Sequence, residues 1–166
     1  MQFDLRAFLE GARKPYEAHF QADLTQSDFG GDTLAAPAEC DFTATPTDDG
    51  AALLLCVKAQ IHAECARCLE PLTQDYCFER DYLILPRDLE GPDFELPCNE
   101  QGCIDLDELV YQELIFEAPA VLLCSADCQG LCPICGKKKA AGCTCKPAAN
   151  AAPVDARLSI LKQLLS

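Results

Sequence analysis

The sequence predicts an α+β protein with an antiparallel, β-rich N-terminal sheet or partial barrel, followed by one helix, a cysteine-rich module and a terminal helix. Three observations predict this architecture. Strand-like segments fill the first two-thirds of the chain, a stretch after residue 105 has helical periodicity, and six cysteines crowd between Cys124 and Cys145. Of the 166 residues, 49% are apolar and 24% are charged, which is typical of a folded protein.

The strands are predicted from alternation and from turn signals. Residues 1–10 favour a short strand followed by one helical turn, and residues 16–24 alternate loosely. In residues 39–45, apolar and polar side chains alternate strictly, and an Asp-Gly turn then leads into the apolar run 51–61. These two segments and their turn predict a β-hairpin from about residue 39 to 63. Aromatic and branched residues predict a further strand over residues 74–85.

Residues 86–102 carry prolines, glycines and carboxylates without apolar periodicity, and this predicts a surface loop. Asp105 then precedes an apolar stripe with helical spacing, so we expect a helix over about 105–118, capped by Asp105 and ended by Pro119. The predicted units are a β-rich domain (1–120), a metal module (121–147), and a linker with a C-terminal helix (148–166).

Composition restricts the classes of function. The chain has thirteen cysteines, an odd number, and no apolar secretory signal at its start, so we expect a cytoplasmic protein with thiols or metal ligands instead of disulfides. No apolar run is long enough for a membrane helix. The net charge of −14 opposes non-specific binding to nucleic acid, so any RNA contact requires a local basic patch or a partner.

The six C-terminal cysteines predict a structural zinc site. Cys132-Pro-Ile-Cys135-Gly has the form of a zinc knuckle, in which a tight turn lets backbone amides approach the sulfurs. Two further ligands come either from Cys143 and Cys145 or from Cys124 and Cys128, and the sequence does not choose between these pairs. Four thiolates leave no open position for water, which indicates a structural ion in a zinc-ribbon-like module. Free or redox-active thiols and an iron–sulfur cluster are the alternatives.

A second pair, Cys65 and Cys68, has spacing suited to a metal or to a redox couple. Arg67 between them could lower the pKa of a thiol, and this allows a cytosolic thiol-disulfide oxidoreductase or redox sensor as the alternative function. Pro71 disfavours the helix that normally follows a redox pair, so a tight turn between strands is favoured.

Two charged segments are candidates for partner contacts. Lys137, Lys138 and Lys139 make the cysteine module basic within an acidic chain, although a solvated loop also explains them. The acidic segment around residues 88–108 could hold a basic protein electrostatically. No phosphate-binding glycine loop, nucleophile elbow or His-Glu metalloprotease motif is present, and the sequence indicates no enzyme and no small-molecule substrate.

Three segments resemble the YceD family of bacterial proteins linked to accumulation of 23S ribosomal RNA. The stretch Glu64-Cys-Ala-Arg-Cys-Leu-Glu-Pro71 is similar to a family signature, and residues 104–119 are similar to its helix entered by Asp-Leu. The spacing from Cys124 to Cys145 resembles the cysteine-rich branch, and Asp155-Ala-Arg-Leu158 approaches the family's closing Asp-Pro-Arg-Leu. Lys137 and the residues after it, and Ala156, depart from the family pattern.

The resemblance implies a non-enzymatic role in ribosome biogenesis: support of 23S rRNA accumulation or processing by binding rRNA or a large-subunit ribosomal protein. Arg67 and the three lysines are the candidate contacts with RNA or a partner. For Cys65 and Cys68, the resemblance gives a family motif without a known role.

Overall fold

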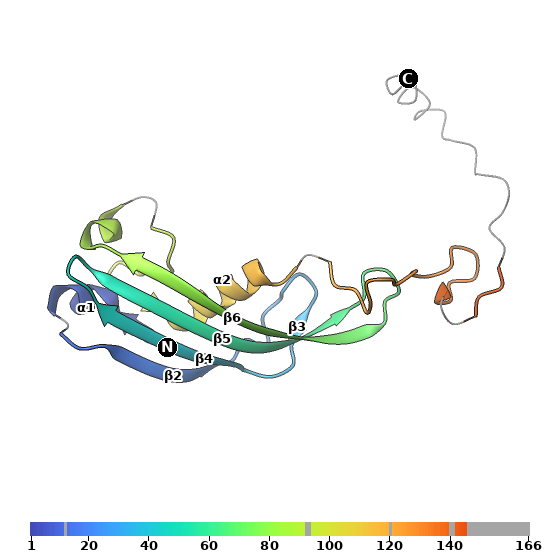
Figure 1. Ribbon diagram of the computed structural model, residues 1–166, viewed down its shortest axis with the longest axis horizontal. Coiled ribbons are helices and arrows are strands. Elements are labelled where there is room, and N and C mark those ends of the chain that lie inside the picture. Colours follow the sequence, from blue (N-terminus) through green and yellow to red (C-terminus); the bar gives the residue numbers. More distant parts are fainter. Residues whose placement is uncertain (12, 92–93, 120, 140–141, 146–166) are drawn as a thin grey trace, which may run out of the picture.

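The computed structural model describes residues 1–11, 13–91, 94–119, 121–139 and 142–145, and within them it has the predicted α+β architecture (Figure 1). The main element is a five-stranded antiparallel sheet of β2 (Tyr16–Ala22), β3 (Thr33–Leu34), β4 (Ala38–Pro46), β5 (Ala51–Glu64) and β6 (Pro71–Ile84). A two-stranded sheet pairs β1 (Gln2–Asp4) with β7 (Cys103–Asp105). The helices are α1 (Leu5–Gly11), the 3-10 helix η1 (Pro86–Glu90) and α2 (Leu106–Glu117).

The large sheet is open, with the order β2-β4-β5-β3, and β6 also pairs with β5. The described strands therefore form an open sheet and not the partial barrel that the sequence also allowed. The β5–β6 hairpin is the longest pairing, because all fourteen residues of each strand are in register, from Ala51 opposite Ile84 to Glu64 opposite Pro71. Its turn, residues 65–70, lies next to the cysteine-rich segment (Figure 1).

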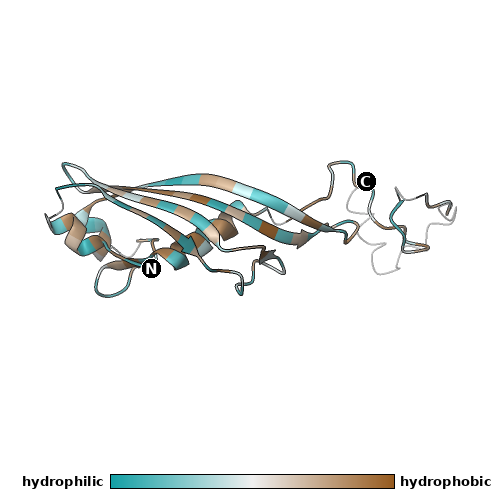
Figure 2. Ribbon diagram, turned by 90° about the horizontal axis from the view of Figure 1, so that it is seen from below, coloured by the Kyte–Doolittle hydropathy of each residue, from teal (hydrophilic) through white to brown (hydrophobic). Residues whose placement is uncertain are grey.

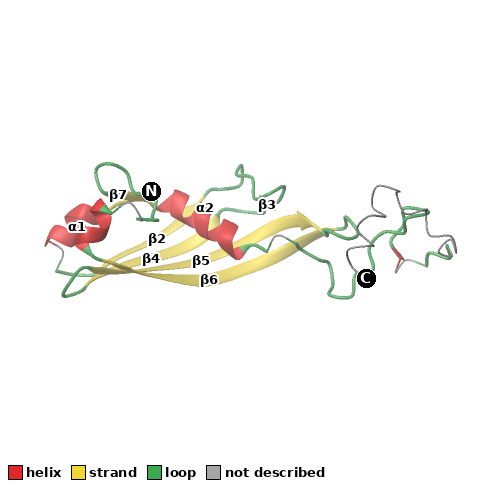
Figure 3. Ribbon diagram, turned by 90° about the horizontal axis from the view of Figure 1, so that it is seen from above, coloured by secondary structure: helices red, strands yellow, loops and turns green. Residues whose placement is uncertain are grey.

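Among the described residues, the helices cover one face of this sheet and leave the other, the uncovered face, open (Figure 3). Both α-helices lie on the same side (Figure 3), and the strands alternate between hydrophobic and hydrophilic residues (Figure 2). Along most of β4 and β5, alternate side chains are buried, including Phe42, Leu53 and Leu55. These side chains pack with Leu109 and Leu114 of α2 in one hydrophobic core.

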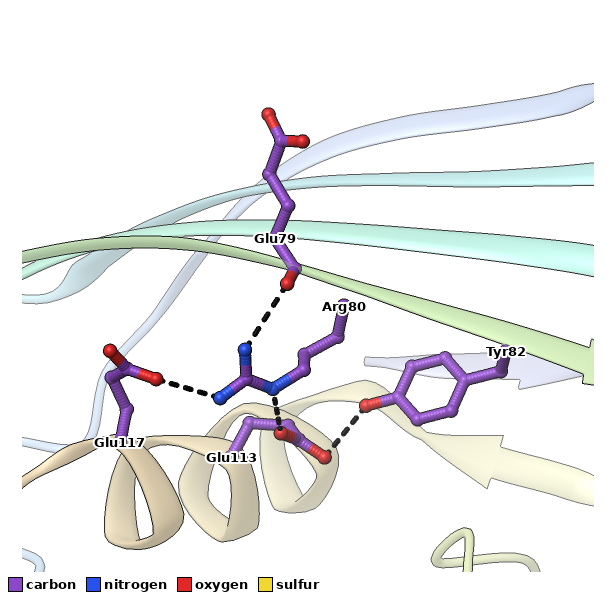
Figure 4. A network of polar contacts seen from close by, with 5 residues as sticks. All are labelled: Glu79, Arg80, Tyr82, Glu113 and Glu117. Atoms are coloured by element: carbon purple, nitrogen blue, oxygen red, sulfur yellow. Dashed lines mark hydrogen bonds and ion pairs between the residues drawn. The ribbon is translucent and has the colours of Figure 1, made fainter.

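Polar contacts fix α2 against β6 (Figure 4). Glu113 accepts hydrogen bonds from the Tyr82 hydroxyl (2.7 Å) and from Arg80 Nε (2.8 Å). A second arm of the Arg80 guanidinium donates to Glu117 at 2.7 Å. At its N-terminus, α2 begins as predicted, because the Asp105 side chain accepts from the amides of residues 107 and 108.

Several predicted elements are confirmed and others were missed. The hairpin of β4 and β5, the strand β6 and the helix α2 lie where the sequence places them. The segment expected as a loop over residues 86–102 contains η1, and the short strands β3 and β7 were not predicted, because two or three residues carry too little periodicity to detect. The predicted linker and C-terminal helix lie outside the described residues. No helix in the described part of the chain is long and apolar enough to cross a membrane.

Candidate metal centre

Eight cysteines of the described chain gather into two groups of four. The hairpin cluster consists of Cys65, Cys68, Cys124 and Cys128; the knuckle cluster consists of Cys132, Cys135, Cys143 and Cys145. In each group, all four sulfur atoms lie within 4.8 Å of one another. None of these cysteines is in a disulfide.

The hairpin cluster joins parts of the chain that are far apart in sequence. Cys65 and Cys68 lie in the turn between β5 and β6, and Cys124 and Cys128 follow α2. The Sγ atoms of Cys65 and Cys128, 63 positions apart, are separated by 3.7 Å, and those of Cys68 and Cys124 by 3.6 Å. Cys65, Cys68 and Cys128 are buried, and Cys124 is the most accessible of the four.

The knuckle cluster is local in sequence and more exposed. Cys135 and Cys143 Sγ are 3.5 Å apart and only eight positions separate them. Cys132 is buried, whereas Cys135 and Cys145 are exposed. Of the two pairs that the sequence left open as partners of Cys132 and Cys135, the one that lies beside them is Cys143 and Cys145.

The spacing of the sulfur atoms fits a tetrahedral metal ion. With metal–sulfur distances of about 2.3 Å, the sulfurs of a tetrahedral zinc site are about 3.8 Å apart. The closest sulfur pairs in the two clusters, at 3.5–3.7 Å, are near this spacing and far from the bonding distance of a disulfide. Each cluster could therefore hold one metal ion with four sulfur ligands.

Backbone amides prepare one thiol in each cluster for the anionic form that a metal ligand requires. The amide of Cys124, followed by those of Arg67 and Cys68, lowers the pKa of the Cys65 thiol to about 6. In the knuckle cluster, the amides of Cys135 and Ile134 lower the pKa of the Cys132 thiol to about 6.

The cysteine-rich segment is also tied to the hairpin turn by ordinary hydrogen bonds. The amide of Leu131 donates to the carbonyl of Arg67 at 3.1 Å, and the amide of Ala66 donates to the carbonyl of Leu122 at 2.9 Å. Lys138 forms an ion pair with Glu70, which follows Cys68 in the turn. The two segments therefore pack as one unit around the hairpin cluster.

The structure brings together some of the residues predicted to contact a partner. Arg67 and Lys139 line one shallow hollow, together with Asp127 and Gln129. The Arg67 guanidinium donates to the carbonyl of Cys128 at 2.9 Å, so it holds the backbone of the cysteine-rich segment. Lys137 is exposed, and Lys138 is engaged with Glu70.

Several carboxylates of the acidic segment around residues 88–108 already have hydrogen-bond or ion-pair partners within the chain, which the sequence did not suggest. Asp88 accepts from the amide of Leu85 at the start of η1, Asp105 caps α2, and Asp107 pairs with the N-terminal amine. These carboxylates have structural partners already, which makes them poor candidates for holding a basic protein.

Sequence reasoning missed the link between Cys65–Cys68 and Cys124–Cys128. The two pairs were assigned separately, because nothing in their spacing shows that the end of α2 returns to the tip of the β5–β6 hairpin. A local signal was present: both Cys65–Cys68 and Cys132–Cys135 have two residues between the cysteines.

Comparison with known proteins identifies the family. No curated protein and no solved structure matches the chain. The model of the family described as "Large ribosomal RNA subunit accumulation protein YceD" matches residues 54–165, which include both cysteine clusters and α2. On this match over more than half of its length, the chain belongs to the YceD family, whose description implies a role in accumulation of the large ribosomal RNA subunit.

Proposed function

We propose that this chain is a non-enzymatic ribosome-biogenesis factor that supports 23S rRNA accumulation by binding a basic large-subunit ribosomal protein. The family description supplies the process and names no enzymatic activity. The observation that carries the choice of partner is the charge of the uncovered face of the large sheet.

The charged side chains of the uncovered face are mostly carboxylates. The outward side chains of β2, β4, β5 and β6 include one lysine, Lys58, and a group of exposed acidic residues: Glu17, Glu39, Asp41, Asp75, Glu79 and Asp81. The strand register places Asp41, Cys56 and Glu79 in one row across the sheet. A broad face with a large excess of negative charge attracts a positively charged partner, and a basic polypeptide complements it.

The cysteine-rich segment is a weaker candidate for binding RNA. Lys138 is neutralised by Glu70, and Asp127 lines the same hollow as Arg67 and Lys139. A metal ion bound by four thiolates also leaves net negative charge at each cluster, which offsets the lysines nearby. With a chain charge of −14, these features favour a protein partner over direct contact with rRNA phosphates.

For the knuckle cluster we propose a structural zinc ion held by Cys132, Cys135, Cys143 and Cys145. An all-thiolate donor set suits zinc, and four protein ligands leave no place for a substrate or water. The ion stabilises a segment with few apolar residues and takes no part in a reaction.

The test uses cells in which the gene for this chain has been deleted. The wild-type chain is expected to restore 23S rRNA levels, and a triple variant of the uncovered face (the open-face variant), Glu39→Gln with Glu79→Gln and Asp81→Asn, is expected to fail. The matched control, Glu10→Gln with Glu95→Gln and Glu100→Gln, changes the same number of exposed carboxylates elsewhere and should restore the RNA.

The class of partner is tested by crosslinking in the same cells, with nuclease treatment before capture. A large-subunit ribosomal protein that is captured by the wild-type chain and the control, but not by the open-face variant, supports the proposal. In a parallel capture without nuclease, 23S rRNA that the open-face substitutions do not affect, and that Arg67→Ala with Lys139→Ala abolishes, would assign the role to the hollow lined by Arg67 and Lys139 instead. Normal rRNA levels after deletion would contradict both assignments.

The competing function is a thiol-disulfide oxidoreductase or redox sensor that uses Cys65 and Cys68. This function requires a reversible Cys65–Cys68 disulfide on which rRNA accumulation depends. Mass spectrometry of non-reduced protein from growing cells would detect such a disulfide. Two further thiols beside this pair favour a metal ligand set over a two-thiol redox couple.

A further inference from the structure

The hairpin turn repeats the local geometry of the zinc knuckle. In the knuckle, the amide of Gly136 donates to the carbonyl of Cys132 at 2.8 Å; in the hairpin turn, the amide of Leu69 donates to the carbonyl of Cys65, also at 2.8 Å. The residue after the second cysteine is left-handed in both, with φ of 68° at Gly136 and 58° at Leu69. The sequence disguises this equivalence, because only the knuckle has the expected glycine.

The backbone hydrogen bonds that close the two turns are also alike. The amide of Cys65 donates to the carbonyl of Glu70, five residues later, at 2.9 Å. The amide of Cys132 donates to the carbonyl of Lys137, at the same offset, at 2.8 Å. In the knuckle, the Cys132 sulfur also accepts from the amide of Ile134 at 3.4 Å, a contact that is typical of a tight turn around a metal thiolate.

The conformation of Leu69 points to a ligand-driven turn. A left-handed backbone is costly for a branched side chain, and Leu69 is 60% exposed, so burial of its side chain does not offset that cost. Among the described residues other than glycine, it is the one with positive φ. Such strain persists where the surroundings require it, and here the turn is what directs Cys65 and Cys68 at the same point.

The burial and the arrangement of the four thiols in the hairpin cluster are also typical of a metal-binding site. Three of its thiols are buried, and Cys124 and Cys128 approach them from a separate segment. The ion pair of Lys138 and Glu70 lies beside the cluster and joins the cysteine-rich segment to the hairpin turn.

From this correspondence we propose that Cys65, Cys68, Cys124 and Cys128 bind a second structural zinc ion, distinct from the ion of the knuckle cluster. This ion fastens the segment after α2 to the tip of the β5–β6 hairpin. The site does not depend on which partner the chain binds, so it stands or falls separately from the function proposed above.

The test is the metal content of the full chain, purified under reducing conditions and measured by elemental analysis. We expect about two zinc ions per wild-type chain, since each four-thiolate set holds one ion. Cys65→Ser with Cys68→Ser and Cys132→Ser with Cys135→Ser should each remove one ion, and the combined variant both. Cys56→Ser with Cys77→Ser, on the uncovered sheet face, is the matched control and should retain two.

A cobalt titration keeps the proposal testable if a serine variant does not fold. The metal-free wild-type chain should take up two equivalents, both with the intense sulfur-to-cobalt absorption of a four-thiolate site. One equivalent, a zinc content of one in the wild type, or a Cys65/Cys68 variant that keeps both ions would overturn the proposal. Iron at the hairpin cluster, or a Cys65–Cys68 disulfide in the freshly purified chain, would also overturn it.

A separate experiment tests whether the ion at the hairpin cluster fastens the segment after α2 to the β5–β6 hairpin. Limited proteolysis should cleave the segment over residues 118–131 at least tenfold faster in the Cys65/Cys68 variant than in the Cys56/Cys77 control. Equal cleavage, with one zinc lost, would show that the ion binds without holding the two segments together.

Discussion

At the scale of single residues, Gly130 shows how closely the cysteine-rich segment approaches the hairpin turn. Its φ is 71°, and a Cβ atom at this position would lie 2.8 Å from the carbonyl oxygen of Arg67. That oxygen accepts the hydrogen bond from the neighbouring amide of Leu131. A side chain here has no room unless the two segments separate.

Gly130→Ala should therefore weaken this contact by about 1–3 kcal/mol, the usual cost of overpacking. We expect amide hydrogen exchange at Leu131 to accelerate roughly ten- to hundredfold, because the local opening becomes easier. Gly136→Ala is the matched control: its φ is 68°, but nothing lies within 4 Å of the added Cβ. Equal acceleration in both variants would assign the effect to backbone strain alone.

Cys40 gives a second prediction, which concerns pH. Burial within the core raises the pKa of its thiol from 9.0 to about 12. The unfolded chain therefore loses this proton at lower pH than the folded chain, and the stabilisation present below pH 9 is lost as the pH rises towards 12. Between pH 8 and pH 10 we expect the free energy of unfolding to fall by about 1 kcal/mol more in the wild type than in Cys40→Ala.

Urea denaturation under reducing conditions at the two pH values measures this difference. Parallel losses in the wild type and the variant would mean that Cys40 ionises as readily in the fold as in the unfolded chain.

At the scale of elements, the attachment of α2 to β6 depends on one carboxylate more than on its neighbour. Glu113 is 14% exposed and serves both Tyr82 and Arg80, whereas Glu117 is 38% exposed and contacts Arg80 alone. Loss of Glu113 leaves the half-buried Tyr82 hydroxyl without its hydrogen-bond acceptor. An unpaired half-buried hydroxyl costs more folding free energy than the loss of an exposed ion pair.

Glu113→Ala should lower the free energy of unfolding by about 1–3 kcal/mol, and Glu117→Ala by less than about 1 kcal/mol. Chemical denaturation of both variants, followed by circular dichroism, compares them directly. A loss at Glu117 as large as that at Glu113 would contradict the ranking.

The same elements show what could be predicted from sequence. Strict alternation in β4 and the Asp-Gly turn before β5 were sufficient to predict the hairpin, and the Asp105 cap and apolar stripe predicted α2. Pairing between distant strands is not encoded in local periodicity. The pairing of β1 with β7 was missed for this reason, since the partners Phe3 and Ile104 lie far apart in the sequence.

At the scale of the whole molecule, the hydrophobic core and the two cysteine clusters are distinct. The main core contains no cysteine of either cluster; Cys65, Cys68 and Cys128 form a small group with Leu72 and Leu123 packed against it, and Leu72 also packs against the main core. Removal of metal should therefore leave the sheet folded, because its stability comes from buried apolar surface.

We expect a strong chelator to leave the far-UV circular dichroism of the sheet and its urea midpoint nearly unchanged. The same treatment should expose residues 118–139 to protease, because metal ligation supplies most of the folding energy there. Loss of the urea transition on chelation would contradict this division, as would a cysteine-rich segment that stays resistant without metal.

The candidate site follows the same division between local and distant information. The knuckle could be recognised from Cys132-Pro-Ile-Cys135-Gly, since its turn lies within five residues. The hairpin cluster could not be recognised, because the pair Cys65 and Cys68 and the pair Cys124 and Cys128 come together only after the chain has folded. Their meeting depends on the length of β6 and on the direction of α2. The acidic character of the uncovered face could not be predicted from the sequence either, since its carboxylates come from four strands and share a face only after the strands pair.

The wide sequence separation within the hairpin cluster has a consequence for the order of assembly. Cys68 and Cys124 are 56 positions apart, whereas Cys135 and Cys143 are separated by eight, so bringing the former together costs more loop-closure entropy. An ion can enter the knuckle in a nascent or partly folded chain, but four sulfurs converge at the hairpin only once the sheet and α2 have formed. Occupancy of the hairpin cluster would thus mark a chain that has completed its maturation.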